Sequence, residues 1–411
     1  MGQKSVLGGA MIAAGTMIGA GMLSLPIMSA GMWFNWTVFI MLITVLFMYT
    51  SAEQILEVNL NYQPGASFDT LVKDNLGRKW NIINGLSVSF VLYILLYAYI
   101  VGSGSVISDT MHKQFDISIS NASAGLIFSI AFTFIVWFST KAVDRLSTIL
   151  MVGMFLTLFA ALFGLLDTVD PVKLFQPTGE SRYAIYAFAS LPFFLTSFCF
   201  HASVPSLVKY YGVDAKRIRK CIFYGMLITF VFYFFWIFAT MGNVERELFQ
   251  SPEAKTGNID SVLWLLGNAN QSPFFGMSLR LFSFFAVVTS FLGAGLGLFD
   301  YIADLFNISN NHKGRLITAL ITFLPPTIGG MFFPNGFVLA IGYAGLFAAI
   351  WSVIVPGLMV MKFRRKQAKA QVAPMFKPFG GKLMPLVIII YGTIAAVSHI
   401  FADIFKVLPV F

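Results

Sequence analysis

The sequence predicts an all-helical protein that crosses a membrane many times. Of its 411 residues, 57% are hydrophobic and only 11% are charged, whereas a soluble domain is usually about 25% charged. Long apolar stretches recur along the whole chain, and a membrane span needs about 20 such residues. Two of the stretches carry glycine, proline and polar residues in their interior. These observations predict a polytopic all-α membrane protein in which two helices are broken.

The apolar stretches are numerous enough for eleven spans, joined by mostly short loops. The predicted spans are residues 5–30, 35–59, 84–111, 121–139, 147–166, 183–208, 219–242, 277–303, 314–333, 336–361 and 383–402. No stretch between them is long enough for a separate soluble domain. We therefore expect residues 1–411 to form a single transmembrane domain.

Lysine and arginine are unevenly divided between the two sides of the predicted membrane. With a cytoplasmic N-terminus, 20 of the 27 basic residues lie in loops on the cytoplasmic side. Basic loops tend to remain in the cytoplasm, so we expect the N-terminus there and, after eleven spans, the C-terminus on the opposite side. The net charge of +9 then reflects this rule and attraction to anionic lipid, and it indicates no nucleic-acid partner.

The two broken spans fall at matching places in two halves of the chain. Spans 1–5 would form one repeat over residues 5–166, and spans 6–10 a second over residues 183–361, with 383–402 as an extra helix. Because five is odd, the repeats would have opposite orientations in the membrane. Broken spans at corresponding positions of such repeats are typical of a transporter's binding site.

The first break lies within the first span. Its small and polar residues are Gly15, Thr16, Gly19, Ala20 and Gly21. Glycine lets the chain unwind and approach a ligand closely, and a half-helix N-terminus attracts a carboxylate. Gly15 and Gly19 also match a GxxxG helix-packing motif, which is the alternative interpretation. The adjoining Gly21 and the second break favour unwinding.

The second break lies within the sixth span and contains Ser197, Phe198, Cys199 and His201. Polar groups deep in a membrane are costly and often functional. Ser197 and His201 are therefore candidate binding residues. His201 has three open roles: it could bind substrate, carry a proton, or hydrogen-bond a freed backbone carbonyl.

Carboxylates occur as two pairs near the predicted inner ends of spans 2 and 8. Glu53 and Glu57 are one helical turn apart, as are Asp300 and Asp304. We expect Glu57 and Asp304 to be solvated at the interface, and Glu53 and Asp300 to lie deeper. Either deeper carboxylate could titrate in a proton-coupled cycle or pair with a basic residue of an inner loop.

Other functional classes find little support in the sequence. The four histidines and two cysteines form neither a metal-ligand cluster nor a nucleophile–base constellation, so we expect no metal, no cofactor and no enzymatic activity. No repeated polar helix suggests a channel pore. Cys199 and Cys221 are expected at different depths, so a disulfide between them is not predicted. A glycine ladder at residues 290–297 predicts close packing of span 8, with span 1 as one possible neighbour.

Three stretches resemble the hydroxy- and aromatic-amino-acid permeases of bacteria. They are residues 15–22, 200–206 and 290–306, and they are supported by residues 57–62, 137–143, 209–212 and 333–345. The likeness covers nearly the whole chain. It implies an inner-membrane protein with eleven spans and the LeuT-type 5+5 fold, in which helices 1 and 6 are discontinuous.

The resemblance also implies a function. It suggests import of an aromatic amino acid, tryptophan first and tyrosine second, by proton symport with alternating access. Residues 15–21 would hold the α-carboxylate and α-amine, and residues 197–201 would close the other side. Relatives commonly carry a lysine in span 5 in place of a sodium ion, whereas Met154 stands there in this chain. Coupling would then run through His201, Glu53 or Asp300, or the coupling ion would not be a proton.

Overall fold

The computed structural model describes residues 5–175, 183–371 and 375–411, and most of these residues are helical. The first half contains α1 (Val6–Met17), α2 (Gly21–Ser29), α3 (Trp33–Asn59), α4 (Phe68–Leu76), α5 (Arg78–Phe115), α6 (Asn121–Phe138), α7 (Thr140–Leu166) and α8 (Pro171–Phe175). Lys4 and Arg182, which contribute to the charge balance, lie outside the described residues.

The second half begins with a short 3-10 helix and ends with a helix that finishes in a π-helical turn. Its main elements are α9 (Ala187–Ser197), α10 (Ser203–Tyr211), α11 (Ala215–Asn243), α12 (Asp260–Ala269), α13 (Pro273–Leu305), α14 (His312–Phe332), α15 (Phe337–Ala348), α16 (Val355–Ala370) and α17 (Met384–His399). A π-helical turn, Ala349–Ile354, joins α15 to α16 without interrupting the rod.

The predicted spans all coincide with helices. Within the described residues, nine helices are long and apolar enough to cross a membrane, and the bent pair α1–α2 adds a tenth. The remaining predicted span, residues 183–208, is divided into α9 and α10, each too short to cross alone. Both helices that were predicted to be broken are therefore broken, which confirms the polytopic all-α class.

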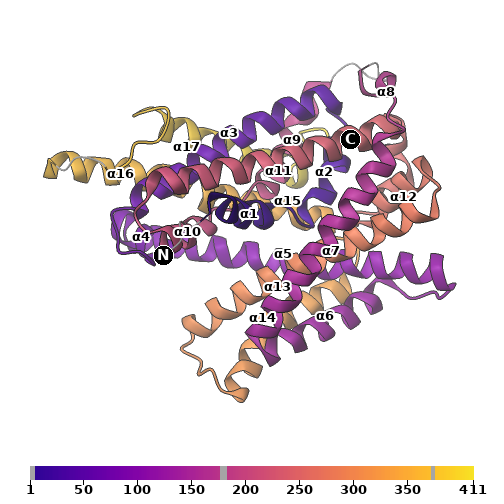
Figure 1. Cartoon of the computed structure of the whole chain (residues 1–411), viewed down its shortest axis with the longest axis horizontal. Helices are drawn as coiled ribbons and strands as arrows, with labels where there is room; N and C mark the ends of the chain where they lie inside the picture. The colour runs from indigo at the N-terminus through magenta and orange to yellow at the C-terminus, as the bar shows by residue number, and fades with distance from the viewer. Residues whose placement is uncertain (1–4, 176–182, 372–374) are drawn as a thin grey trace.

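The spans form two groups that meet along the middle of the molecule. One group is a four-span bundle in which α1–α2, α3, α9–α10 and α11 contact one another. The other consists of α5, α6, α13 and α14, of which α6, α13 and α14 lie at the lower edge of Figure 1. Helix α7 runs along α13, while α15, α16 and α17 pack against α5, α3 and α9 respectively.

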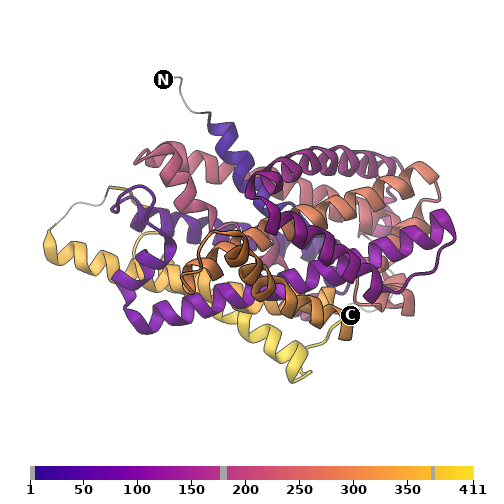
Figure 2. The ribbon, with the colours of Figure 1, turned by 90° about the horizontal axis from the view of Figure 1, so that it is seen from below.

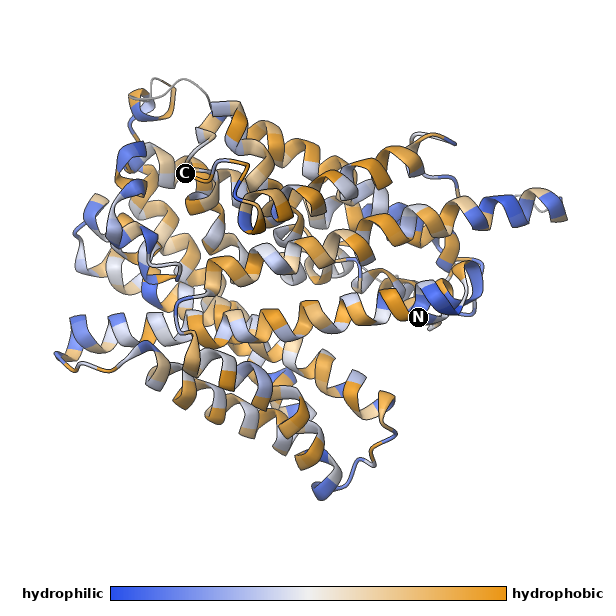
Figure 3. Ribbon diagram, turned by 180° about the vertical axis from the view of Figure 1, so that it is seen from behind, coloured by the Kyte–Doolittle hydropathy of each residue, from blue (hydrophilic) through white to orange (hydrophobic). Residues whose placement is uncertain are grey.

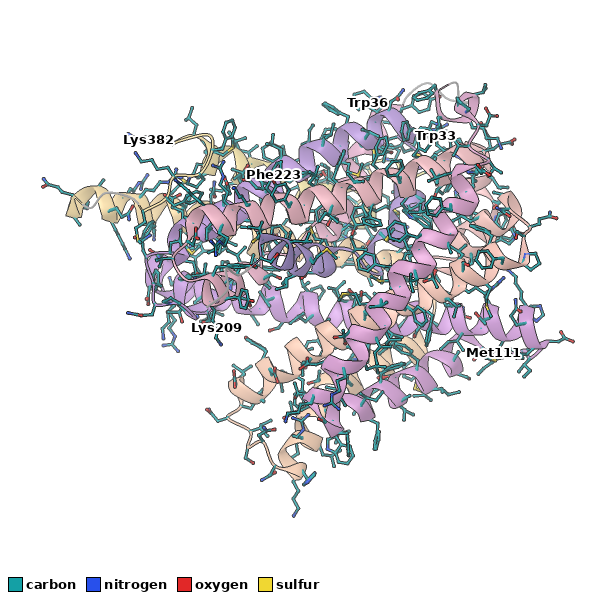
Figure 4. All side chains as sticks on the ribbon, in the orientation of Figure 1. Trp33, Trp36, Met111, Lys209, Phe223 and Lys382 are labelled. Carbon is teal, nitrogen blue, oxygen red and sulfur yellow. The ribbon has the colours of Figure 1, made fainter. Side chains whose placement is uncertain are left out.

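Polarity is concentrated at the two ends of the helices. Hydrophobic residues cover most of the helix length in Figure 3, and hydrophilic residues gather at the ends and along the projecting tip of α16. Lys209 and Lys382 lie at the end that holds the N-terminus, whereas Trp33 and Met111 lie at the opposite end (Figure 4). This distribution is that of a protein whose helices cross a bilayer.

Candidate functional site

The first break occurs where α13 approaches the first span. Helices α1 and α2 differ in direction by 58°, and residues 18–20 between them are not helical. A Cβ atom at Gly19 would lie only 2.5 Å from Ser290 Oγ of α13. The Ala20 N–H donates a hydrogen bond to the same Oγ at 3.2 Å. A side chain at position 19 would therefore displace the Ser290 hydroxyl, which binds a backbone amide that the break has freed. Ser290 is thus a contact between α13 and the first span, whereas Gly295 of the glycine ladder packs against Phe323 and Leu96.

Prolines explain which carbonyls the two breaks leave free. Pro26 in α2 has no N–H, so it cannot bond the carbonyl four residues earlier, that of Met22. Trp236 Nε1 of α11 donates to this carbonyl instead, at 3.1 Å. Pro205 in α10 likewise cannot bond the carbonyl of His201, which accepts from the Val204 N–H at 3.2 Å. Residues 198–202, which precede α10, are accordingly not helical.

The two breaks lie against each other. Thr16 Oγ1 of the first span is 3.2 Å from Ser203 Oγ of the sixth. A Cβ atom at Gly21 would lie 3.4 Å from Ser197 Oγ. The start of α2 therefore faces the end of α9, so the positive end of one helix dipole meets the negative end of another. The structure thus brings together the two groups of candidate residues that the sequence placed 180 positions apart.

One side chain of α11 forms hydrogen bonds with the backbone at both breaks. The hydroxyl of Tyr233 lies 2.6 Å from the Met17 carbonyl oxygen and 3.0 Å from the Ser197 carbonyl oxygen. Tyr233 is fully buried. Its single O–H proton is shared between two acceptors, so one carbonyl has capacity for a further donor. The sequence analysis missed Tyr233 and Trp236, because nothing in their local pattern distinguishes them from the many other aromatic residues.

Two polar atoms at the second break are buried without a partner. Ser197 Oγ and His201 Nε2 make no hydrogen bond in the described part of the chain, and the two side chains are 2% and 0% exposed. A buried polar atom without a partner costs about 1–3 kcal/mol. Such atoms beside an unwound backbone are where a polar ligand would be bound.

Aromatic rings surround these polar atoms. Phe198 packs edge-on against Tyr233, with ring centroids 5.0 Å apart. The His201 ring lies between Phe200, at 5.4 Å, and Trp351, at 6.2 Å. The arrangement combines backbone groups that lack helical hydrogen bonds with an apolar, aromatic lining, as small-molecule sites commonly do.

The breaks are more exposed toward the end where α1 begins than toward the opposite end. Thr16 and Ala202 are exposed, whereas Gly19, Ala20 and Phe198 are buried. Helix α1 projects from the body of the molecule toward the N-terminus in Figure 2. At the opposite end, Arg246 is buried and its guanidinium donates to the carbonyls of Ala30 and Gly31, which closes the end of α2.

Glu53 is buried and paired rather than free. It accepts hydrogen bonds from Tyr49 Oη at 2.7 Å and from the Phe379 N–H at 3.3 Å. Its carboxylate also forms an ion pair with Arg219 of α11 at 2.5 Å. Glu53 therefore contacts the segment that joins α16 to α17.

The expectation that Glu57 is solvated is wrong. Glu57 is only 2% exposed, because Arg364 of α16 covers it with two parallel hydrogen bonds of 2.7 and 2.8 Å. A distant arginine thus stabilises a carboxylate that the local sequence places at a helix end. Asp300, by contrast, is exposed on α13, as is Asp304, so the expected difference in depth is absent from this pair.

The position expected to hold a lysine in span 5 is apolar. Met154 of α7 is buried, and its sulfur lies 3.9 Å from Thr289 Oγ1, next to Ser290 on α13. Met154 therefore faces α13 beside the residue that contacts the first break. Cys199 and Cys221 are both free thiols, as expected.

Comparisons with known proteins agree with this geometry. Residues 2–399 match the model of the tryptophan/tyrosine permease family. The chain is 46% identical to the tryptophan-specific transport protein of Pseudomonas aeruginosa (strain UCBPP-PA14), over 98% of this chain and 96% of that protein. It is 40% identical to the tyrosine permease of Enterobacter agglomerans, over 99% of this chain and 98% of that protein.

A solved structure shows the same fold. A mutant of the Eremococcus coleocola manganese transporter matches with a TM-score of 0.61 and 12% identity, over 98% of this chain and 87% of that one. At this identity the likeness concerns the fold alone. It confirms the LeuT-type fold that the resemblance to the permeases implied.

Proposed function

The chain belongs to the tryptophan/tyrosine permease family, and we propose that it imports an aromatic amino acid, tryptophan before tyrosine, by proton symport. The observation that carries this proposal is the contact between the two breaks, with the unpartnered Ser197 Oγ beside Gly21. An enzyme would need a reactive constellation, whereas this arrangement offers only binding groups.

The geometry suggests how a zwitterionic substrate would bind. Its carboxylate would lie at the N-terminus of α2, near Gly15–Gly21, where the helix dipole is positive. Its ammonium would lie at the ends of α1 and α9, where Tyr233 leaves carbonyl capacity on Met17 and Ser197. Both charges need such partners, because an unpaired charge in an apolar interior costs several kcal/mol. The ring would occupy the aromatic surroundings of Phe198.

For coupling, we favour His201 among the three candidates. It lies in the second break with Nε2 unpartnered, so it is placed to exchange a proton when the site rearranges. Glu53 is the second candidate, because release of Arg219 would make its carboxylate available. Asp300 is the third, since it is exposed and lies near the end of α13.

The proposed topology follows the charge distribution. The protein would lie in a bacterial inner membrane with a cytoplasmic N-terminus and a periplasmic C-terminus. Residues 5–166 and 183–361 would form the inverted repeats, and residues 383–402 the additional helix. The exposed Thr16 and Ala202 would then lie on the cytoplasmic side of the proposed site.

Uptake of labelled tryptophan tests the proposal. In cells that lack other aromatic carriers, this protein should concentrate tryptophan, and unlabelled tryptophan should compete best, followed by tyrosine. Alanine and leucine should compete poorly, because neither fills an aromatic pocket. Equilibration without accumulation would indicate a channel, and conversion of the label would indicate an enzyme. Equal competition by aliphatic amino acids would overturn the substrate assignment.

A further inference from the structure

The segment that joins α16 to α17 exposes large apolar side chains outside the helices. We refer to its residues 375–383 as the connecting segment. Met375, Phe379 and Leu383 are 57%, 63% and 73% exposed. The segment lies at the end of the molecule that holds the N-terminus, where Figure 4 marks Lys382. Side chains of this kind favour an apolar environment over water.

Exposed basic residues accompany these apolar side chains. Lys377 and Lys382 alternate with them in the connecting segment, and both are exposed. On the adjoining end of α16 the exposed basic residues are Lys362, Arg365, Lys366 and Lys369. The sequence contains no aspartate or glutamate between Asp304 and Asp403. This positive charge therefore has no acidic partner within its own stretch of the chain.

The opposite side of the connecting segment is held by the protein. The Phe379 N–H donates to Glu53 at 3.3 Å, and Arg364 Nη1 donates to the Gly381 carbonyl at 2.7 Å. Pro378, which precedes Phe379, is buried. Because these contacts fix the backbone, the apolar and basic side chains are directed outward rather than folded onto the protein.

We propose that the connecting segment, with the exposed basic face of α16, binds anionic phospholipids of the surrounding leaflet. Met375, Phe379 and Leu383 insert among the upper parts of the acyl chains, while Lys377 and Lys382 reach the phosphates. Clustered basic residues next to a membrane span attract anionic lipid in this way. The bound lipid rests directly on the segment that contacts Glu53 and Arg364, so it stabilises the inner end of the bundle.

Lipid retention tests this inference without relying on transport. The full chain is placed in nanodiscs of phosphatidylcholine with a fraction of phosphatidylglycerol, then released into detergent, and the phosphatidylglycerol that remains bound is measured by native mass spectrometry. Replacing Lys377 and Lys382 together by glutamine should weaken retention roughly fivefold for each lysine. Raising the salt concentration should reproduce part of the loss in the unchanged protein.

A matched control removes the same charge elsewhere on the same end. Lys141 and Lys313 are also exposed basic residues, in the first turns of α7 and α14, and replacing both by glutamine should leave retention nearly unchanged. If both double variants lost the same amount of bound phosphatidylglycerol, retention would depend on general surface charge, and the inference would be wrong. Unchanged retention in Lys377→Gln/Lys382→Gln would also overturn it.

A second measurement examines the segment itself. Hydrogen exchange of the amides of residues 375–383 should slow in phosphatidylglycerol nanodiscs relative to pure phosphatidylcholine, and Phe379→Ser/Leu383→Ser should abolish the difference. Inorganic phosphate added to phosphatidylcholine nanodiscs should not slow exchange. If phosphate alone produced the full protection, the ligand would be a free anion rather than lipid, and the inference would be wrong.

Discussion

At the scale of single residues, side chains of α11 supply hydrogen bonds to the backbone carbonyls that the broken spans leave free. Freed backbone groups inside a bilayer cannot bond to water and must find partners in the protein. Tyr233 binds the carbonyls of Met17 and Ser197, and Trp236 binds that of Met22. These two residues are three positions apart and therefore share one helix face. One face of α11 thus holds both breaks in the unwound form.

Tyr233→Phe should reduce transport on the order of tenfold, because two buried carbonyls lose their donor. The variant should still insert, since the hydrophobic span is unchanged. Initial uptake rates and melting in detergent are the measurements. Tyr93→Phe is the matched control: it also removes a tyrosine–carbonyl bond, to Ile321, but between α5 and α14, away from the breaks. If Tyr233→Phe transported tryptophan at the wild-type rate, Tyr233 would not be part of the functional site.

His201→Asn tests the proton assignment at the same scale. Asparagine retains a polar side chain but cannot titrate, whereas histidine changes charge between about pH 5 and 8. If His201 carries the proton, the variant should lose the pH dependence of uptake over this range. Initial rates at several external pH values, at a fixed membrane potential, give the profile. If uptake were slower but its pH dependence unchanged, His201 would have a structural role. Glu53 would then be the next candidate for the proton carrier.

At the scale of elements, the close approach of α13 to the first break should limit what position 19 tolerates. Gly19→Ala places a Cβ against Ser290 Oγ, so uptake should fall strongly, and Gly19→Val should abolish it while the protein still inserts. Gly293→Ala on α13 is the control, because its Cβ would meet no atom within 4 Å.

The double variant Gly19→Ala/Ser290→Gly isolates the cause. Removing the serine side chain relieves the contact but also removes the acceptor of the Ala20 N–H. Uptake should therefore recover partly relative to Gly19→Ala, without reaching the wild-type rate. Failure to recover at all would mean that Gly19 is required for backbone conformation rather than for its distance from α13.

The elements also show what local sequence can and cannot predict. The helices and both breaks follow from hydropathy and from glycine and proline, which act within a few residues. The partners of the freed groups come from α11 and α13, more than 200 positions from the first break. The burial of Glu57 depends likewise on Arg364. Pro26 did offer a signal, since it requires a donor for the Met22 carbonyl, but it does not identify Trp236.

At the scale of the whole molecule, the proposed site lies within the four-span bundle, which we propose moves against the remaining helices. Thr16 and Ala202 are exposed at one end of it. At the other end Arg246 holds Ala30 and Gly31, and Trp33 donates to the Lys173 carbonyl at 2.8 Å. Alternating access requires that these outer contacts open when the inner end closes. Under the proposed mechanism, transport would couple two distant sets of contacts to one binding site.

The last prediction concerns the ion whose gradient drives transport, which we propose is the proton. In proteoliposomes with an inward proton gradient, labelled tryptophan should accumulate above its external concentration, and an uncoupler should collapse that accumulation. Replacing external sodium by choline should leave the initial rate unchanged, because we propose coupling through His201 and not through a bound metal ion. A dependence on sodium would instead favour an ion site beside Ser290 and Thr289, where α13 meets the first break and Met154 stands in place of a lysine. The same vesicles, measured with both gradients imposed in turn, separate the two mechanisms in one preparation.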